Sequence, residues 1–406
     1  MEFRGWNGQP SYHRIDDDVE HSASKQKRKA GSTGNRWFDL SRWLRSVRVV
    51  LTVFVISFLT LLGLLYLVEA IVGRSRVLWK YTIYPYDVGP DELAKPSTNG
   101  LSGVVPIRCH SHNDYWRREP LYDALRTGCT GVEADVWLFD GELYVGHGVT
   151  SLRLNLTFQG MYVKPLLAML DQKNSSGLLA TNPGASAIYD ADPSQTLVLL
   201  VDFKTDGIET FEAVRDQLRP LRDAGHLSYW DGHDIHLRAV TVVGSGTAPF
   251  SVMTQNQTYR DIFYDAPLAE LWEDPEEALA TSGDVQELDS EGGHAKATSR
   301  LQDMDAEDYS VSNSYYASTS FRQSIGIVWF GHLSQSQMRT IRGQIREAKR
   351  RGLKARYWET PAWPTALRNH VWGVLIEEGA DVLSVDDLQA AARLDWTTPV
   401  HDVWWR

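Results

Sequence analysis

The chain has 406 residues, 43% of them hydrophobic, which is enough for one large folded domain with additional segments. Its formal net charge is −11, and it has no basic patches interleaved with aromatic residues, so a nucleic acid is not an expected partner. The individual segments of the chain indicate which other functions are expected.

Residues 1–46 are polar and show little apolar periodicity, so we expect a disordered tail. Within it, the acidic run Asp16–Asp18 is followed by a basic cluster between Lys25 and Lys29. This cluster could contact anionic lipid, but a solvated run of charge is the simpler interpretation. Its positive charge then matters mainly for the orientation of the segment that follows.

Residues 49–68 form a run of 20 residues without a charge, inside a transmembrane helix that we predict at 47–72. A run of this length can cross a hydrocarbon core about 30 Å thick. A cleavable signal peptide is the rival, but the run is longer than the usual apolar core of a signal and lies far from Met1. Eight Lys and Arg residues between positions 25 and 48 precede it, and three between 74 and 80 follow it. This bias predicts a cytosolic amino terminus.

A cytosolic amino terminus would place everything after about residue 72 in a secretory lumen or outside the cell. N-glycosylation acceptors are then expected on the carboxyl-terminal side, and Asn-x-Ser/Thr triplets lie there at Asn155, Asn174 and Asn256. Such triplets also arise by chance, so each weighs little alone. Together with the charge bias they predict a single-pass membrane glycoprotein whose main domain is lumenal or extracellular.

Residues 73–102 contain prolines and glycines among polar residues, which is typical of a stalk. Residues 103–398 carry eight apolar runs, several separated by helical patterns, and this predicts a closed parallel (β/α)₈ TIM barrel of the α/β class. The expected strands are Val104–Cys109, Gly131–Leu138, Thr196–Phe203, Arg238–Val243, Arg260–Asp265, Ile325–Phe330, Lys354–Trp358 and Asp381–Val385. The clearest helices are Leu121–Thr127, Glu209–Asp223, Gln335–Arg351 and Arg368–Glu378.

Two further segments interrupt or follow the barrel pattern. Residues 267–320 are acidic and poor in apolar residues, so we predict a long surface insertion that is partly disordered. Residues 399–406 form a short carboxyl-terminal tail.

The two cysteines, Cys109 and Cys129, could pair in an oxidising lumen. We place Cys109 near the carboxyl end of the first strand, and Cys129 before the second strand, at the opposite end of the barrel. At about 3.3 Å per residue, that separation exceeds the ~7 Å that a disulfide tolerates. The sequence therefore predicts no intramolecular disulfide.

A cluster of chemically active side chains lies between Arg108 and Gly148. His110 and His112 follow the first apolar run, Glu133 and Asp135 lie inside the second, and His147 comes after it. Side chains alternate along a strand, so Glu133 and Asp135 point the same way, roughly 6–7 Å apart. Two such carboxylates suit one hard cation, Mg²⁺ or Ca²⁺. A buried salt bridge is the alternative, but two carboxylates on one buried face are costly without a cation or a lysine.

The apolar run Val198–Val201 ends in Asp202, and Lys204 follows on the same face. Asp202 can supply a third metal ligand, and Lys204 can bind a phosphate oxygen. The alternative is a plain buried ion pair between them.

The order His110, Glu133-Ala-Asp135, His147 and Asp202-Phe-Lys204 resembles the PLC-like phosphodiesterase superfamily, which includes glycerophosphodiester phosphodiesterases, phosphatidylinositol phospholipases C and sphingomyelinases D. The HSHNDYW and EADVWL segments are most similar to the fungal altered inheritance of mitochondria protein six family. The His-Arg-Gly of the glycerophosphodiesterases is replaced here by His-Ser-His-Asn-Asp. Their third glutamate ligand is Asp202 here, as in the sphingomyelinase D branch. The family's name also leaves a mitochondrial location open.

This resemblance implies a (β/α)₈ barrel, a divalent cation and two histidines, one acting as base or nucleophile and the other as acid. We expect Glu133, Asp135 and Asp202 to hold the cation, with Lys204 on the phosphate. The histidines are then His110 as base or nucleophile and His147 as acid, since an imidazole pKa near 6.5 suits both roles. His112 is the other candidate for a catalytic histidine. Asn113 is a candidate substrate-binding residue, and Asn113 and Asp114 could also hold a histidine tautomer or a metal-bound water. The substrate expected is a glycerophosphodiester or a phospholipid or lysolipid head group.

Two other functions stay open. His110-Ser-His112 could be a zinc pair of an amidohydrolase-like barrel, with His332 as a further ligand, although this leaves Glu133 and Asp135 without a role. The barrel could also be catalytically silent and bind lipid or a partner. Each of the histidines could in turn be a satisfied core residue, as we assume for His233, His236 and His370.

Overall fold

The computed structural model describes residues 42–64, 101, 103–175, 188–272, 309–329 and 331–396. The chain divides into two units, residues 1–85 and residues 86–406. The predicted amino-terminal tail up to residue 41, nearly all of the stalk, residues 273–308 of the predicted insertion and the tail at 399–406 lie outside the described residues.

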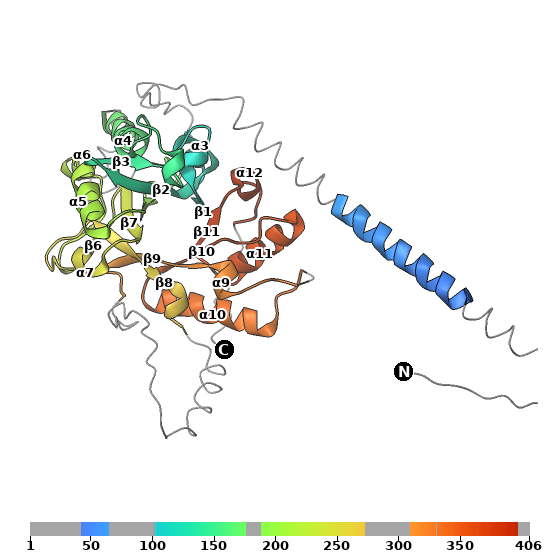
Figure 1. Ribbon diagram of the computed structural model, residues 1–406. Helices are drawn as coiled ribbons and strands as arrows, with labels where there is room; N and C mark the ends of the chain where they lie inside the picture. Colours follow the sequence, from blue (N-terminus) through green and yellow to red (C-terminus); the bar gives the residue numbers. More distant parts are fainter. Residues whose placement is uncertain are drawn as a thin grey trace, which may run out of the picture. The chain divides into compact units, whose positions relative to one another are not determined.

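In the first unit, a helix runs from Arg42 to Leu64 (blue in Figure 1). It has 23 residues and a mean hydropathy of 2.4 over its most apolar window, and none of that window is buried in the protein. By length and composition it can cross a membrane, and a signal sequence would pass the same test. It begins five residues before the transmembrane helix predicted at 47–72, and it includes residues 49–64 of the uncharged run.

The second unit is built on a closed barrel (Figure 1). In the part of the chain that the structure describes, eight parallel strands follow one another in the order β1-β11-β10-β9-β8-β7-β4-β2, and β2 pairs with β1 to close the ring. The antiparallel β3 (Glu142–Val145) extends β2 at its far end. The bounds of the eight are β1 Ile107–Ser111, β2 Cys129–Phe139, β4 Leu197–Phe203, β7 Val240–Gly246, β8 Ile262–Pro267, β9 Ser314–Ser320, β10 Lys354–Trp358 and β11 Val382–Val385.

Helices cover the outside of this barrel, as expected for parallel strands joined by crossover connections (Figure 1). The described α-helices are α3 Tyr122–Thr127, α4 Lys164–Ser175, α5 Gly207–Gln217, α6 Arg219–Asp223, α7 Phe250–Met253, α9 Phe321–Ser324, α10 Gln335–Arg350, α11 Thr365–Glu377 and α12 Leu388–Ala391. A small hairpin of β5 (Tyr229–Trp230) and β6 (Ile235–His236) lies between α6 and β7. Local sequence sets the helix ends: the Asp206 carboxylate caps α5, and Ser334 and Gln337 form a capping box at α10.

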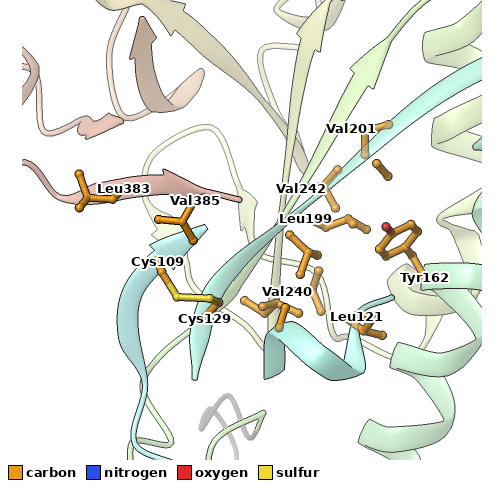
Figure 2. Close-up of a cluster of buried hydrophobic side chains, with 14 of the residues drawn as sticks. Cys109, Leu121, Cys129, Tyr162, Leu199, Val201, Val240, Val242, Leu383 and Val385 are labelled. Carbon is orange, nitrogen blue, oxygen red and sulfur yellow. A yellow bond between two sulfur atoms is a disulfide. The ribbon is translucent and has the colours of Figure 1, made fainter. Parts of the chain in front are cut away.

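The burial pattern of β4 shows how the apolar strands face two environments. Leu197, Leu199 and Val201 pack into the larger core, which includes buried residues of α4, α5, α10 and α11. Figure 2 shows Leu199 and Val201 within this cluster. The alternate residues Val198 and Leu200 join a smaller cluster inside the barrel, with side chains from β7, β9 and β11. Both faces of the strand are buried, which is why its sequence is apolar throughout. Inward-facing positions near the strand ends are therefore the ones that can carry polar chemistry.

The predicted (β/α)₈ barrel is confirmed, and most strands lie within three residues of the predicted bounds. One strand was wrong. Residues 325–329 of the predicted strand 325–330 instead form a loop after α9, which ends at Ser324, and Ile327 and Trp329 are exposed there. The strand in that place is β9, which pairs with β8 and β10. Its polar sequence SYYASTS had been included in the 267–320 insertion, whose predicted start also overlaps the end of β8.

The prediction that Cys109 and Cys129 do not pair was also wrong: they form a disulfide, with Cα atoms 4.7 Å apart (Figure 2). β1 starts at Ile107 and continues to Ser111, so Cys109 lies in mid-strand rather than at its end. Cys129 is the first residue of β2 and pairs in register with Ile107. The register shifts between Ile107 and His110, which brings Cys109 beside Cys129. The bond joins the two strands that carry the histidines and the Glu-x-Asp pair.

Candidate active site

Three carboxylates meet at the carboxyl ends of two neighbouring strands. Asp135 on β2 is the register partner of Asp202 on β4, and Glu133 lies one inward-facing position below Asp135. One oxygen from each of Glu133, Asp135 and Asp202 lies within 4.8 Å of the others. Gly246, with φ of 68°, leaves the necessary room, because a Cβ there would lie 2.0 Å from the Asp202 Oδ1 atom. The predicted trio is therefore brought together.

The donor set of this trio fits a hard cation. The Oδ1 atoms of Asp135 and Asp202 are buried and accept no hydrogen bond within the described ranges. Burial, together with the charge of Glu133, raises the pKa of Asp135 to about 7. Such clustered carboxylates repel one another, and a divalent cation bound to carboxylate oxygens would offset that repulsion. The residues present could thus hold Mg²⁺ or Ca²⁺.

Lys204 lies beside the same carboxylates. Its Nζ atom is 2.5 Å from Asp202 Oδ2 and 3.1 Å from Asp135 Oδ2. Burial lowers the pKa of Lys204, but the two carboxylates outweigh this and leave the pKa above its ordinary value. The side chain is a quarter exposed, so a positive charge is available at the edge of the acidic cluster.

His110 is fully buried beneath the site. Its Nε2 atom is 3.9 Å from Glu133 Oε2, and neither ring nitrogen has a hydrogen-bond partner among the described residues. Burial, with the charge of Arg356, lowers the pKa of His110 well below 6.5, so its ring is neutral. Gly131 makes space for the ring, since a Cβ there would lie 2.2 Å from His110 Nδ1.

His112 reaches the mouth of the site, with 24% of its side chain exposed. Its Nε2 atom is 3.9 Å from Glu133 Oε2, and its Nδ1 atom is 2.8 Å from Asp386 Oδ1. Burial lowers the pKa of His112, but the hydrogen bond to Asp386 and the charge of Glu133 raise it above its ordinary value overall. Arg117 holds this corner by donating to the carbonyl oxygens of His112 and Asp386.

His147 lies beside Asp135, with 60% of its side chain exposed. Its Nδ1 atom is 3.5 Å from Asp135 Oδ2 and 3.3 Å from the Tyr115 hydroxyl oxygen. That hydroxyl also lies 2.8 Å from Asp135 Oδ2 and 2.6 Å from Asn113 Oδ1, and it can donate to one of them at a time. The Trp116 ring packs beside His147, with centroids 5.1 Å apart.

Asn113 and Asp114 shape the loop after β1. Asn113 has a left-handed φ of 46°, and its backbone N–H donates to Glu133 Oε2 at 3.3 Å. Its side-chain Nδ2 atom lies 3.4 Å from His112 Nδ1. The fully buried Asp114 accepts hydrogen bonds from the Leu121 N–H and the Tyr162 hydroxyl. These two hydrogen bonds tie the loop after β1 to Leu121 and Tyr162.

Two site residues were missed from the sequence, Asp386 and Arg356. Asp386 directly follows β11, and a carboxylate at the end of a predicted strand was a signal that could have found it. Arg356 lies in mid-strand on β10, where its Nη2 atom is 3.3 Å from Glu133 Oε2 across the barrel. Nothing in the local sequence indicates that contact, because it depends on which strands face each other.

The zinc arrangement is not assembled in the described part of the chain. The cluster of possible metal ligands found there consists of Glu133, Asp135 and Asp202. His332 lies in the loop after α9, next to Trp329, with which it forms an isolated bridge.

The parallel barrel, with acidic, lysine and histidine side chains gathered at one site, fits the PLC-like phosphodiesterase superfamily, and sequence comparison agrees. The family model described as the AIM6-like phosphodiesterase domain matches residues 98–265. A homolog of altered inheritance of mitochondria protein 6 from Arthroderma benhamiae is 35% identical over 72% of this chain and 85% of its own length. The Eremothecium gossypii protein of that name is 33% identical over 76% of this chain and 73% of its own length. The chain belongs to the altered inheritance of mitochondria protein 6 family.

Among solved structures, the chain is similar to L. pealei PLC21. The match covers 71% of this chain and 34% of that one, at 13% sequence identity and a TM-score of 0.34. A likeness this weak supports no conclusion about activity, and the barrel itself rests on the strand pairing described above.

Proposed function

We propose that the barrel is a metal-dependent phosphoric diester hydrolase that acts on glycerophosphodiesters or on phospholipid or lysolipid head groups. The observation that carries this proposal is the meeting of Glu133, Asp135 and Asp202 beside Lys204, with His112 near Glu133 and His147 near Asp135. A bound Mg²⁺ or Ca²⁺ would polarise the phosphodiester and offset its negative charge. Lys204 is placed to bind a second non-bridging oxygen.

The two accessible histidines are suited to proton transfer. His112, oriented by Asp386, removes the proton of the attacking hydroxyl, which comes either from water or from the substrate itself. His147 donates a proton to the leaving alkoxide as the P–O bond breaks, so one proton is taken up and one is released. The sequence favoured His110 as the base. The burial of His110 and the exposure of His112 favour His112 instead, with His110 as a neutral ring that packs beneath Glu133.

The location that we propose is a membrane of the secretory pathway, with a cytosolic amino terminus and a lumenal or extracellular barrel. The Cys109–Cys129 disulfide supports it, because such bonds persist in oxidising compartments. The names of the relatives point instead to mitochondria, which is the competing location. A membrane anchor would keep the barrel close to lipid substrates.

The test is an assay of the full-length protein, purified in detergent, against glycerophosphocholine, lysophosphatidylcholine and sphingomyelin, with Mg²⁺, Ca²⁺ or a chelator. We expect release of a head group or formation of a cyclic phosphate with at least one substrate, and loss of activity in chelator. His112→Asn should lower kcat/KM by about 10²–10⁴-fold. A folded protein that binds these lipids but turns none of them over would instead be a lipid-binding barrel.

A further inference from the structure

The barrel interior contains a buried charge that the proposed chemistry does not use. Arg356, on β10, is 4% exposed and lies among inward-facing side chains of β2, β8, β9 and β11. A buried guanidinium is costly unless its surroundings compensate it. The contacts that compensate the charge of Arg356 therefore indicate the role of this residue.

Three of those contacts, with Asp265, Ser318 and Ser384, form a frame around the guanidinium group. The fourth reaches one oxygen of Glu133. The Nη1 atom of Arg356 is 3.7 Å from Asp265 Oδ2 and 3.4 Å from the Ser318 Oγ atom. The Nη2 atom is 3.1 Å from Ser384 Oγ and 3.3 Å from Glu133 Oε2. The frame thus fixes a rigid, planar donor whose Nη2 N–H points at Glu133, while the buried Nε atom has no hydrogen-bond partner among the described residues.

Glu133 is contacted on one oxygen. The Asn113 N–H and Arg356 Nη2 lie 3.3 Å from Oε2, and the Nε2 atoms of His110 and His112 lie 3.9 Å from it. The described residues offer no hydrogen bond or ion pair to Oε1. A carboxylate held through one oxygen presents the other in a fixed direction, which is how partners outside the coordination sphere orient metal ligands.

We infer that Arg356, anchored by Asp265, is a positioning residue that holds Glu133 Oε2 and thereby presents Oε1 to the divalent cation. The inference rests on the proposed function, since it assumes that the trio binds a cation. Arg356 makes no contact with the cation or the substrate in this role. Its effect is on cation affinity, and this can be measured without turnover.

Two effects of removing Arg356 oppose each other, and the experiment must separate them. Removing a positive charge near a cation site would tighten cation binding, whereas releasing Glu133 would weaken it. The double variant Arg356→Met with Asp265→Asn removes one charge of each sign, so the net charge of the barrel interior is unchanged. Removing both members of a buried pair is also less damaging to the fold than removing one.

The matched control is the double variant Arg342→Met with Glu378→Gln. Arg342 on α10 makes a two-bonded contact with Glu378, at 2.8 and 2.7 Å, on the outside of the barrel. This pair also loses one charge of each sign but has no contact with the acidic trio.

Mg²⁺ and Ca²⁺ binding to the full-length protein would be measured by isothermal titration calorimetry, with circular dichroism as the check on folding. We expect the Arg356/Asp265 variant to bind the cation about 10–100-fold more weakly than the parent, and the control variant to be unchanged. Equal or tighter binding in a folded Arg356/Asp265 variant would overturn the inference. If that variant does not fold, Arg356→Lys answers the same question, because it keeps the charge and loses the planar geometry; unchanged affinity in Arg356→Lys would also overturn it. A parent protein that binds no cation would instead refute the proposed function.

Discussion

At the scale of single residues, His147 and His112 differ in what surrounds them. His147 is largely exposed beside Asp135 and Tyr115, whereas His112 is tied to Asp386. An exposed imidazole over the acidic trio is suited to donating a proton to a departing group, and one oriented by a carboxylate is suited to accepting a proton. This difference predicts distinct responses to substrate chemistry.

Replacing His147 with Asn should remove the proton donor and spare cation binding. The loss in kcat/KM should be about 10²–10⁴-fold for an alkyl leaving group and much smaller for nitrophenolate, which departs without protonation. His112→Asn should not be rescued by the better leaving group. Equal losses of the His147 variant on both kinds of substrate, measured by steady-state kinetics, would show that His147 is not the acid.

Asp114 predicts a pH effect on stability. Burial, partly opposed by Arg117, raises its pKa from 3.8 to about 6. An ionised Asp114 therefore costs stability above about pH 6, and this cost is relieved as the pH falls from 6 towards 3.8. Asp114→Asn cannot take up the proton. Lowering the pH from 7.5 to 5 should thus favour the parent over the variant by roughly 1 kcal/mol in unfolding free energy. A parallel pH dependence of both proteins in denaturant titrations would contradict the shift.

At the scale of elements, much of the fold follows from strand composition. β10, with the sequence KARYW, was predicted with the same bounds although it contains Lys354 and Arg356. β4 was predicted closely because both faces of a barrel strand are buried, which leaves a continuous apolar run bounded by polar residues. β9 was not, because it buries tyrosine, alanine and small hydroxyl side chains, and SYYASTS has no apolar run. Its identity as a strand comes from its pairing with β8 and β10.

In the candidate site, too, some features follow from local sequence and others only from how the strands pair. The Glu133, Asp135 and Asp202 trio was predictable because alternation along one strand and the meeting of neighbouring strand ends are local rules. Two other features were not predictable from the sequence. They are the contact of Arg356 with Glu133 and the disulfide between Cys109 and Cys129. Both depend on the register and order of strands. A shift of three residues at the start of β1 and two at its end was enough to reverse the conclusion about the cysteines.

The disulfide between β1 and β2 carries a prediction at this scale. The bond closes a loop of 20 residues in the unfolded chain, and both cysteines are fully buried. Replacing both with Ala should lower the free energy of unfolding by about 2–4 kcal/mol. Chemical denaturation would measure it, with the reduced parent protein as a second comparison. An unchanged free energy of unfolding in the double variant would show that the disulfide does not stabilise the fold.

At the scale of the whole molecule, the proposed lumenal or extracellular location of the barrel requires glycosylation acceptors that solvent can reach. Asn256 is exposed, and its Oδ1 atom accepts hydrogen bonds from the N–H and hydroxyl of Thr258, so a glycan on its amide would extend into solvent. Asn155 is exposed as well. The fold is therefore compatible with carbohydrate at these two acceptors.

Expression in a eukaryotic host should yield a glycoprotein whose gel mobility increases after glycosidase treatment. Replacing Asn155, Asn174 and Asn256 together with Gln should abolish that shift. A parent protein that never carries carbohydrate, and that fractionates with mitochondria, would contradict the secretory location.

In the proposed site, Glu133, Asp135 and Asp202 together bind one hard divalent cation. The most direct measurement is equilibrium dialysis of the full-length protein against Mg²⁺, Ca²⁺ and Zn²⁺, followed by elemental analysis. We expect one Mg²⁺ or Ca²⁺ per chain, and we expect Glu133→Gln to lose it. The control variant Glu377→Gln, whose side chain is exposed on α11, should retain it. Stoichiometric zinc that survives dialysis, or Mg²⁺ and Ca²⁺ binding that is unchanged in a folded Glu133→Gln protein, would contradict this expectation.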